Sequence, residues 1–114
     1  MASYFYRSSE MKFVNHPVYE GVQVAKLVSK EDGQPVGVLV LQIAPGVEIP
    51  VHTHDVNVDS IFVVAGRGVV FVNGRWEEVG AGDYILASAG EEHGVRNQGD
   101  EPLVLFIHHS PPLM

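Results

Sequence analysis

The chain has 114 residues, of which 46% are hydrophobic and 18% charged, and this is the size and composition of a single globular domain. Fourteen acidic residues against seven basic ones give a formal net charge of -7, and an acidic surface repels phosphate groups, so we expect no nucleic-acid partner. There is no cysteine, which excludes disulfides and thiolate ligands and leaves imidazole and carboxylate groups for any metal ion.

The amino end carries no long apolar segment of the kind that a secretory signal needs. The longest apolar stretch, residues 36–44, is interrupted by Gly37 and Gln42 and is far shorter than a membrane-spanning helix. We therefore expect a cytoplasmic protein without a membrane partner.

Short apolar runs rich in Val and Ile, each closed by Gly, Pro, Asn or Asp, predict strands along the whole chain. No segment keeps an apolar period of 3.6 residues, which predicts little helix. The expected strands cover residues 12–14, 22–28, 36–43, 60–65, 68–72, 76–79, 84–87, 94–97 and 103–109. So many short strands in a chain of this length predict an all-β sandwich or barrel.

The clearest local signal is Asn73-Gly74, which lies between the apolar run ending at Val72 and the run that begins near Trp76. Asn and Gly both tolerate a positive φ, which a two-residue hairpin turn requires at its central positions. The sequence therefore predicts a tight hairpin here.

Two histidines, His52 and His54, are separated by one residue. If they lie on one strand, residues i and i+2 share a face, and the two imidazoles can converge on one ion. For the pair taken alone, two surface histidines beside a turn are the favoured interpretation, so the surrounding residues have to decide whether a metal site is present.

Those surroundings resemble the cupin superfamily, whose two motifs read G-x5-H-x-H-x3–4-E-x6-G and G-x5-P-x-G-x2-H-x3-N. The first motif corresponds to residues 46–66 and the second to residues 82–97. The matching residues are Gly46, His52, His54, Asp59 and Gly66, followed by Gly82, Gly90, His93 and Asn97. Asp59 stands where the family has Glu, and Ser88 stands where it has Pro. The resemblance implies one cupin domain over residues 1–114, folded as a double-stranded β-helix, or jelly-roll, barrel.

The resemblance also implies that His52, His54, Asp59 and His93 hold one divalent transition metal ion. Imidazole and carboxylate ligands suit Fe, Mn, Ni, Zn or Cu, and the ligand set does not select among them. Asp59 is one methylene shorter than the usual Glu, so it is expected either as a direct ligand or in a water-mediated role. An octahedral ion would keep two or three positions open for water, substrate or dioxygen.

His108 and His109 are adjacent on the last expected strand, so a complete strand would point one of them inward as a possible proton shuttle. Asp59 and His109 are accordingly the candidate catalytic residues. We favour the alternative that both histidines lie at the frayed end of the chain, beside Ser110. His16, next to Pro17, is interpreted as a loop residue.

A cupin fold does not assign a reaction, since the family includes oxygenases, isomerases, lyases and storage proteins. The leading hypothesis is a metal-dependent enzyme acting on a small organic molecule, either a non-haem oxygenase or a sugar-acid isomerase or lyase. The alternative is a non-catalytic module that binds or senses a metabolite, with the metal as an anchor. Small cupins commonly dimerise through an amino-terminal strand, and the aromatic segment from Tyr4 to Phe13 could supply one, so we expect a homodimer.

Overall fold

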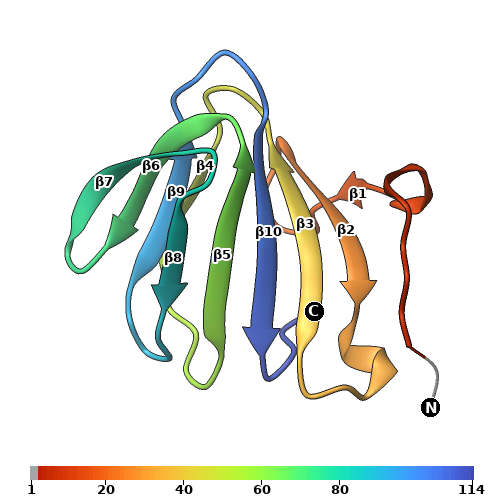
Figure 1. The fold of residues 1–114 in the computed structure, drawn as a ribbon. Coiled ribbons are helices and arrows are strands. Elements are labelled where there is room, and N and C mark those ends of the chain that lie inside the picture. Colours follow the sequence, from red (N-terminus) through yellow and green to blue (C-terminus); the bar gives the residue numbers. More distant parts are fainter. Residues whose placement is uncertain (1–2) are drawn as a thin grey trace.

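The computed structural model describes residues 3–114, which form two facing antiparallel β-sheets (Figure 1). One sheet has six strands in the order β1-β2-β3-β10-β5-β8, and the other has four in the order β4-β9-β6-β7. The strands are β1 Val14–Asn15, β2 Val22–Val28, β3 Gly37–Ile43, β4 Glu48–His52, β5 Val58–Ala65, β6 Arg67–Val72, β7 Arg75–Gly80, β8 Tyr84–Ala87, β9 His93–Asn97 and β10 Leu103–Ser110. Two short 3₁₀ helices, Ser8–Glu10 and Lys30–Asp32, are the helical elements of the described chain. The expected all-β jelly-roll architecture is confirmed.

The hairpin predicted at Asn73-Gly74 is present between β6 and β7. Val72 pairs with Arg75, and the two residues between them have φ angles of 54° and 81°. Both central positions thus occupy the positive-φ region that the Asn-Gly pair tolerates.

Strand β4 is absent from the strands expected from the sequence, and Pro50 lies inside it. Proline cannot donate a hydrogen bond to a neighbouring strand, and it is therefore tolerated mainly on edge strands. β4 is an edge strand of the four-stranded sheet, and its pairing with β9 is interrupted between Ile49 and His52. The edge position explains how strand β4 accommodates Pro50.

The core lies between the two sheets and is built by residues that alternate along each strand. On β10 the inward positions are Leu103, Leu105, Ile107 and His109, all buried, while the residues between them are more exposed. The alternation continues through His109 because β10 stays paired with β5 as far as Ser110. The interpretation that His108 and His109 lie at a frayed end is therefore wrong.

Asn97, from the second cupin-like motif, and Gly66, from the first, have structural roles. Asn97 is 1% exposed; its Nδ2 donates to the carbonyl oxygens of Ile43 and Glu101, and its Oδ1 accepts from the N–H of Gly99. Gly66 has a φ of +85°, and a Cβ there would lie 2.6 Å from the carbonyl oxygen of Pro102. These residues hold the turns between strands in place, and neither lines the cavity described below.

Among residues 3–114 no helix is long and apolar enough to span a membrane.

Candidate metal centre

Three histidines converge between the two sheets. His52 ends β4 and is paired in register with His93, which begins β9, and their ring centroids are 4.4 Å apart. His54 lies two residues beyond the end of β4, with its ring centroid 4.8 Å from that of His52 and 5.1 Å from that of His93. The convergence therefore comes from cross-strand pairing and the chain that follows β4, and not from two histidines on one strand as expected.

Two of these imidazoles have a defined tautomer. The Nδ1 of His52 lies 2.7 Å from the carbonyl oxygen of Pro50, and the Nδ1 of His93 lies 3.1 Å from that of Glu91. A carbonyl oxygen can only accept, so each Nδ1 carries the proton and donates it. In the neutral form of each ring, the Nε2 atom therefore keeps a free lone pair. This is the arrangement found in metal-binding histidines.

Asp59, on β5, faces this cluster and is 6% exposed. Its Oδ2 lies 3.1 Å from the Nε2 of His93 and 3.9 Å from the Nε2 of His54. If the ring of His93 is neutral, its Nε2 lone pair faces this carboxylate oxygen at about van der Waals distance. A cation between them, either a proton or a metal ion, removes that repulsion.

The residues present fit a metal ion. One donor atom from each of His52, His54 and His93 lies within 4.8 Å of the others, and the buried Nε2 of His93 has no hydrogen-bond partner. Two nitrogens bound to one ion at about 2.1 Å can be at most about 4.2 Å apart, so only small side-chain adjustments are needed. Imidazole nitrogens with one carboxylate suit first-row transition metals better than Mg or Ca.

The electrostatics of the cluster depend on its burial and on Asp59. Burial opposes ionisation of Asp59, but the imidazoles of His109 and His93 outweigh it and hold the pKa of that carboxyl well below its usual range. Burial lowers the pKa of His93, yet the Asp59 carboxylate and the Glu91 carbonyl outweigh it and raise that pKa above the ordinary value. Burial, with the neighbouring His52 and His93, lowers the pKa of His54.

His109 joins the cluster from β10, and it is 5% exposed. Its Nε2 lies 3.4 Å from the Oδ1 of Asp59, so the carboxylate has one oxygen toward His93 and the other toward His109. His54, Asp59 and His109 form a second group whose donor atoms lie within 4.8 Å of one another. In the sequence, the apolar alternation that leads from Leu103 to Ile107 was the signal that could have placed His109 inside.

A cavity of about 270 Å³ opens beside the cluster between the sheets. His16 and Tyr19, from the loop before β2, line it with the histidines and Asp59, and the residues of the two sheets supply apolar walls. The sequence interpretation of His16 as a loop residue is confirmed, but its place in the cavity was missed, because nothing in the sequence shows which loop folds over the barrel. Arg96 lies away from the site, where it pairs with Glu48 at 2.6 Å and covers the ring of Trp76.

The family model of the cupin domain matches residues 39–109, which include every member of this cluster. The chain is a cupin. The oxalate-binding protein of Thermotoga maritima is 30% identical to it over 84 residues, covering 72% of this chain and 69% of that protein. The crystal structure of a predicted oxalate decarboxylase from Thermotoga maritima superposes with a TM-score of 0.83 at 26% identity, covering 92% of this cupin and 96% of that chain.

A second curated relative is the tetracenomycin polyketide synthase protein TcmJ of Streptomyces glaucescens. It is 25% identical over 71 residues, which are 62% of this cupin. The match spans 48% of the length of that relative, so about half of it has no counterpart in the alignment.

Proposed function

We propose that this cupin holds one divalent transition metal ion on His52, His54 and His93, with Asp59 as the fourth protein ligand, and acts on a small organic molecule in the adjoining cavity. The observation that carries the proposal is the pair of Nδ1–H donations to backbone carbonyls, because they direct the Nε2 lone pairs of His52 and His93 into one space. The buried Nε2 of His93 without a hydrogen-bond partner supports it further.

A bound Fe, Mn, Ni, Zn or Cu ion supplies Lewis-acid or redox chemistry at its open coordination positions. The lowered pKa of Asp59 keeps its carboxylate ionised at neutral pH, as a metal ligand must be, and the same shift makes it a weak base. His109 lies on the other oxygen of that carboxylate and steadies its orientation. The apolar walls exclude water from the reacting groups.

Of the enzyme types considered, the oxygenase-like one is favoured over the sugar-acid isomerase or lyase. A sugar acid needs a cation to hold its carboxylate, and none of the described residues that line the cavity is Lys or Arg. The second candidate function is non-catalytic binding of a metabolite, which the oxalate-binding relative favours.

A comparison of two samples distinguishes the two functions. The metal-loaded protein and its His93→Ala variant are incubated in air with a small-molecule extract, and the compounds are compared by mass spectrometry. An enzyme consumes a compound that the variant leaves untouched, and the consumption requires metal. If a compound copurifies with the native protein and is returned chemically unchanged in every case, the protein is a binding module.

Metal affinity should fall as the pH is lowered, because an imidazole must be neutral to coordinate. The raised pKa of His93 means that its ring takes up a proton at a higher pH than an ordinary histidine, so competition begins there. His54, whose pKa is lowered, stays neutral further down and competes later. Equilibrium dialysis between about pH 8 and pH 5 should show affinity constant at the upper end and falling by up to ~10-fold per pH unit per displaced proton below it. Affinity unchanged over this range would speak against histidine ligands.

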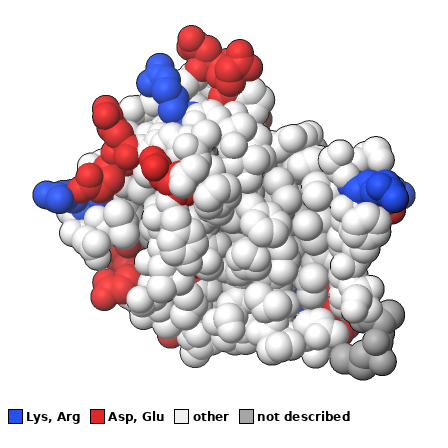
Figure 2. Space-filling view, in the orientation of Figure 1, with Lys and Arg blue, Asp and Glu red and all other residues white. Residues whose placement is uncertain are grey.

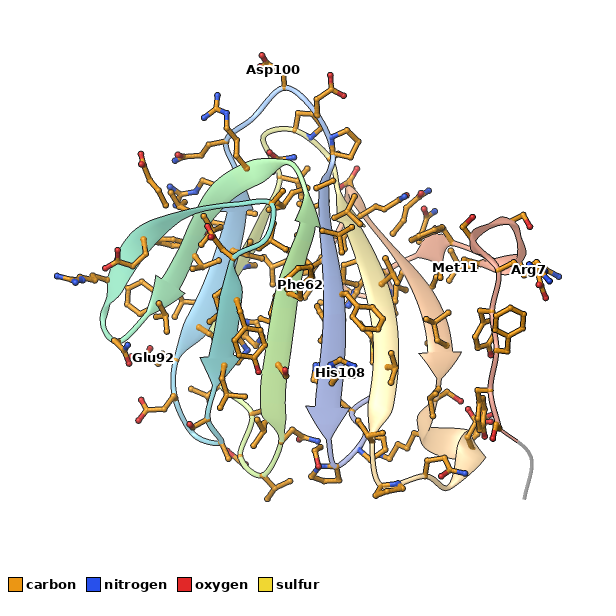
Figure 3. The ribbon with its side chains drawn as sticks, in the orientation of Figure 1. Arg7, Met11, Phe62, Glu92, Asp100 and His108 are labelled. Atoms are coloured by element: carbon orange, nitrogen blue, oxygen red, sulfur yellow. The ribbon has the colours of Figure 1, made fainter. Side chains whose placement is uncertain are left out.

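The outer side of the six-stranded sheet supports the proposal that the protein is a homodimer. Phe62 and His108 project from this side in Figure 3, and in Figure 2 the same face is largely free of charge, with acidic and basic groups at its margin. We call this surface the outer face; its residues are Val38, Val40, Ser60, Phe62, Val64, Tyr84, Leu86, Val104, Phe106 and His108. Phe62, Val64, Tyr84 and Leu86 are each 42–58% exposed, although they are large apolar side chains.

A second copy of the chain is the occupant that this face fits best. A symmetric dimer brings identical patches together, so charged surfaces of a chain with net charge -7 repel one another there, whereas an uncharged face does not. Met11 and Phe13, from the amino-terminal segment, already pack beside Ala25, Leu27, Val38 and Phe106 on the same side of the sheet. The aromatic amino end therefore extends the outer face, and deletion of residues 1–13 should weaken the dimer.

Replacing Phe62 by Glu should convert the dimer to monomer, because two carboxylates would be buried at the centre of a symmetric interface without partners. Phe62 is 42% exposed in the single chain, so the variant should fold. Sedimentation at micromolar concentration measures the outcome. Val56→Glu, at a 68% exposed valine outside the outer face, is the matched control and should stay dimeric. A native protein that sediments as a monomer contradicts the proposal.

A further inference from the structure

The cavity has a polar end and an apolar body. Its polar groups are Asp59, Tyr19 and the five histidines at positions 16, 52, 54, 93 and 109. The remaining walls are mostly Val, Ile and Leu side chains from both sheets, such as Leu39, Val95 and Leu105. Among the described lining residues Asp59 has the one carboxylate side chain, and none is Lys or Arg. Away from the metal-binding cluster the walls therefore offer no partner to a charged group, and burying one against them is costly.

The size of the cavity limits the ligand as well. About 270 Å³ is room for roughly nine water molecules at ~30 Å³ each. A molecule on the order of ten non-hydrogen atoms fills it, and the walls favour one that is mostly hydrocarbon.

His16 contributes a hydrogen-bond donor of fixed direction to this cavity. Its Nδ1 accepts from the backbone N–H groups of Val18, at 3.1 Å, and Tyr19, at 3.2 Å. Two donors on one nitrogen require a lone pair there, so the proton of the neutral ring is on Nε2. Burial, together with the charge of Lys26, lowers the pKa of His16 and keeps the ring neutral. Nε2 thus donates, and it cannot become an acceptor without disrupting the turn from His16 to Tyr19.

The ring of His16 lines the same cavity as the metal-binding cluster. The ring of Tyr19 is 4.8 Å from the ring of His16 and 6.4 Å from that of His52, so Tyr19 links the two. Among residues 3–114 no group accepts a hydrogen bond from the Nε2 of His16. The donor is therefore free for a ligand.

We infer that the cavity takes a mainly hydrocarbon molecule that carries an oxygen acceptor at one end, and that His16 selects it by donating its Nε2–H to that oxygen. The inference rests on the proposed function in treating this cavity as the ligand site. It names the ligand class and a specificity-determining residue that acts by a hydrogen bond and not through the metal.

Ligand class is tested by calorimetry with 4-tert-butylcatechol and oxalate on the metal-free protein, where neither compound can chelate an ion and the walls and His16 remain. The catechol should bind at least about 10-fold more tightly than oxalate, because its alkyl ring buries apolar surface that oxalate lacks. It should also bind the zinc-loaded protein, in which the metal has no redox chemistry with the catechol. Oxalate binding as tightly as the catechol to the metal-free protein, or no binding of the catechol to either form, overturns the inference. Zinc content, measured on the same sample, reports separately on the proposed metal site.

The role of His16 is tested with His16→Asn. The Oδ1 of Asn can accept from the N–H groups two and three residues on, so the turn is kept while the ring N–H is removed. Catechol affinity should fall about 10-fold, the size of one lost hydrogen bond at the upper end of its range, while zinc affinity and the melting temperature stay the same. His108→Asn makes the same change on the outer face and should leave catechol affinity unaltered. If His16→Asn binds the catechol as tightly as the native protein, the assignment of His16 is wrong.

Discussion

Replacing His52, His54 or His93 by Ala should abolish stoichiometric metal binding in each case. Each substitution removes one of at most four protein ligands and leaves a gap between the remaining imidazoles. Changes that only affect the neighbours of metal ligands cost ~10- to 100-fold in affinity, so loss of a ligand itself should cost more. Metal content after purification, determined by elemental analysis, should fall below about a tenth of the native value if affinity drops by this much.

The control for these variants is His108→Ala, which removes an imidazole one residue from the buried His109 but on the outer face. It should keep the native metal content. Full metal content in all three ligand variants would show that the ion, if bound, is held elsewhere.

Asp59 is the second position where a large effect is expected. Its Oδ2 is 3.1 Å from the Nε2 of His93, so the shorter Asp side chain does reach the cluster. Asp59→Asn keeps the shape and removes the negative charge, and it should weaken metal affinity by at least ~10-fold. Asp59→Glu keeps the charge, so it should retain most of the affinity, although the longer side chain would occupy space that an open coordination position needs. Any activity should therefore fall in this variant even where metal is retained.

The same Asn variant has a second measurable consequence in the metal-free protein. The carboxylate of Asp59 raises the pKa of His93, so its removal should lower that pKa toward or below the ordinary histidine value. Titration followed by NMR of the ring protons measures this shift. If Asp59→Asn and Asp59→Glu both leave affinity, activity and the pKa of His93 unchanged, Asp59 has no role at the metal.

Features set by a few neighbouring residues were predicted well from the sequence. The hairpin at Asn73-Gly74 depends on two residues that tolerate positive φ, and it forms where they stand. The cupin motifs place His52, His54, Asp59 and His93 in one cluster because their spacing encodes which strands face each other. Both predictions use information that is local or that is carried by fixed spacings.

The missed features depend on pairing between distant segments. β4 was not among the expected strands; it contains Pro50, which an edge strand tolerates, and the edge position is set by pairing with β9. His109 was expected at a frayed end of the chain, whereas pairing of β10 with β5 holds the strand in order as far as Ser110. His16 enters the cavity through the fold of the loop before β2, which bonds to its Nδ1. Such placements require a register or a loop path that the sequence does not state.

The most direct measurement of the central claim is the metal content of the native protein, freshly purified from cells grown with iron, manganese, nickel, zinc and copper. We expect one transition-metal ion per chain, released on acidification as His52, His54 and His93 take up protons. Iron would favour the oxygenase-like function, and zinc or nickel would favour Lewis-acid chemistry. A protein that emerges without metal, and that binds none of the five ions in calorimetric titration at neutral pH, would contradict the account.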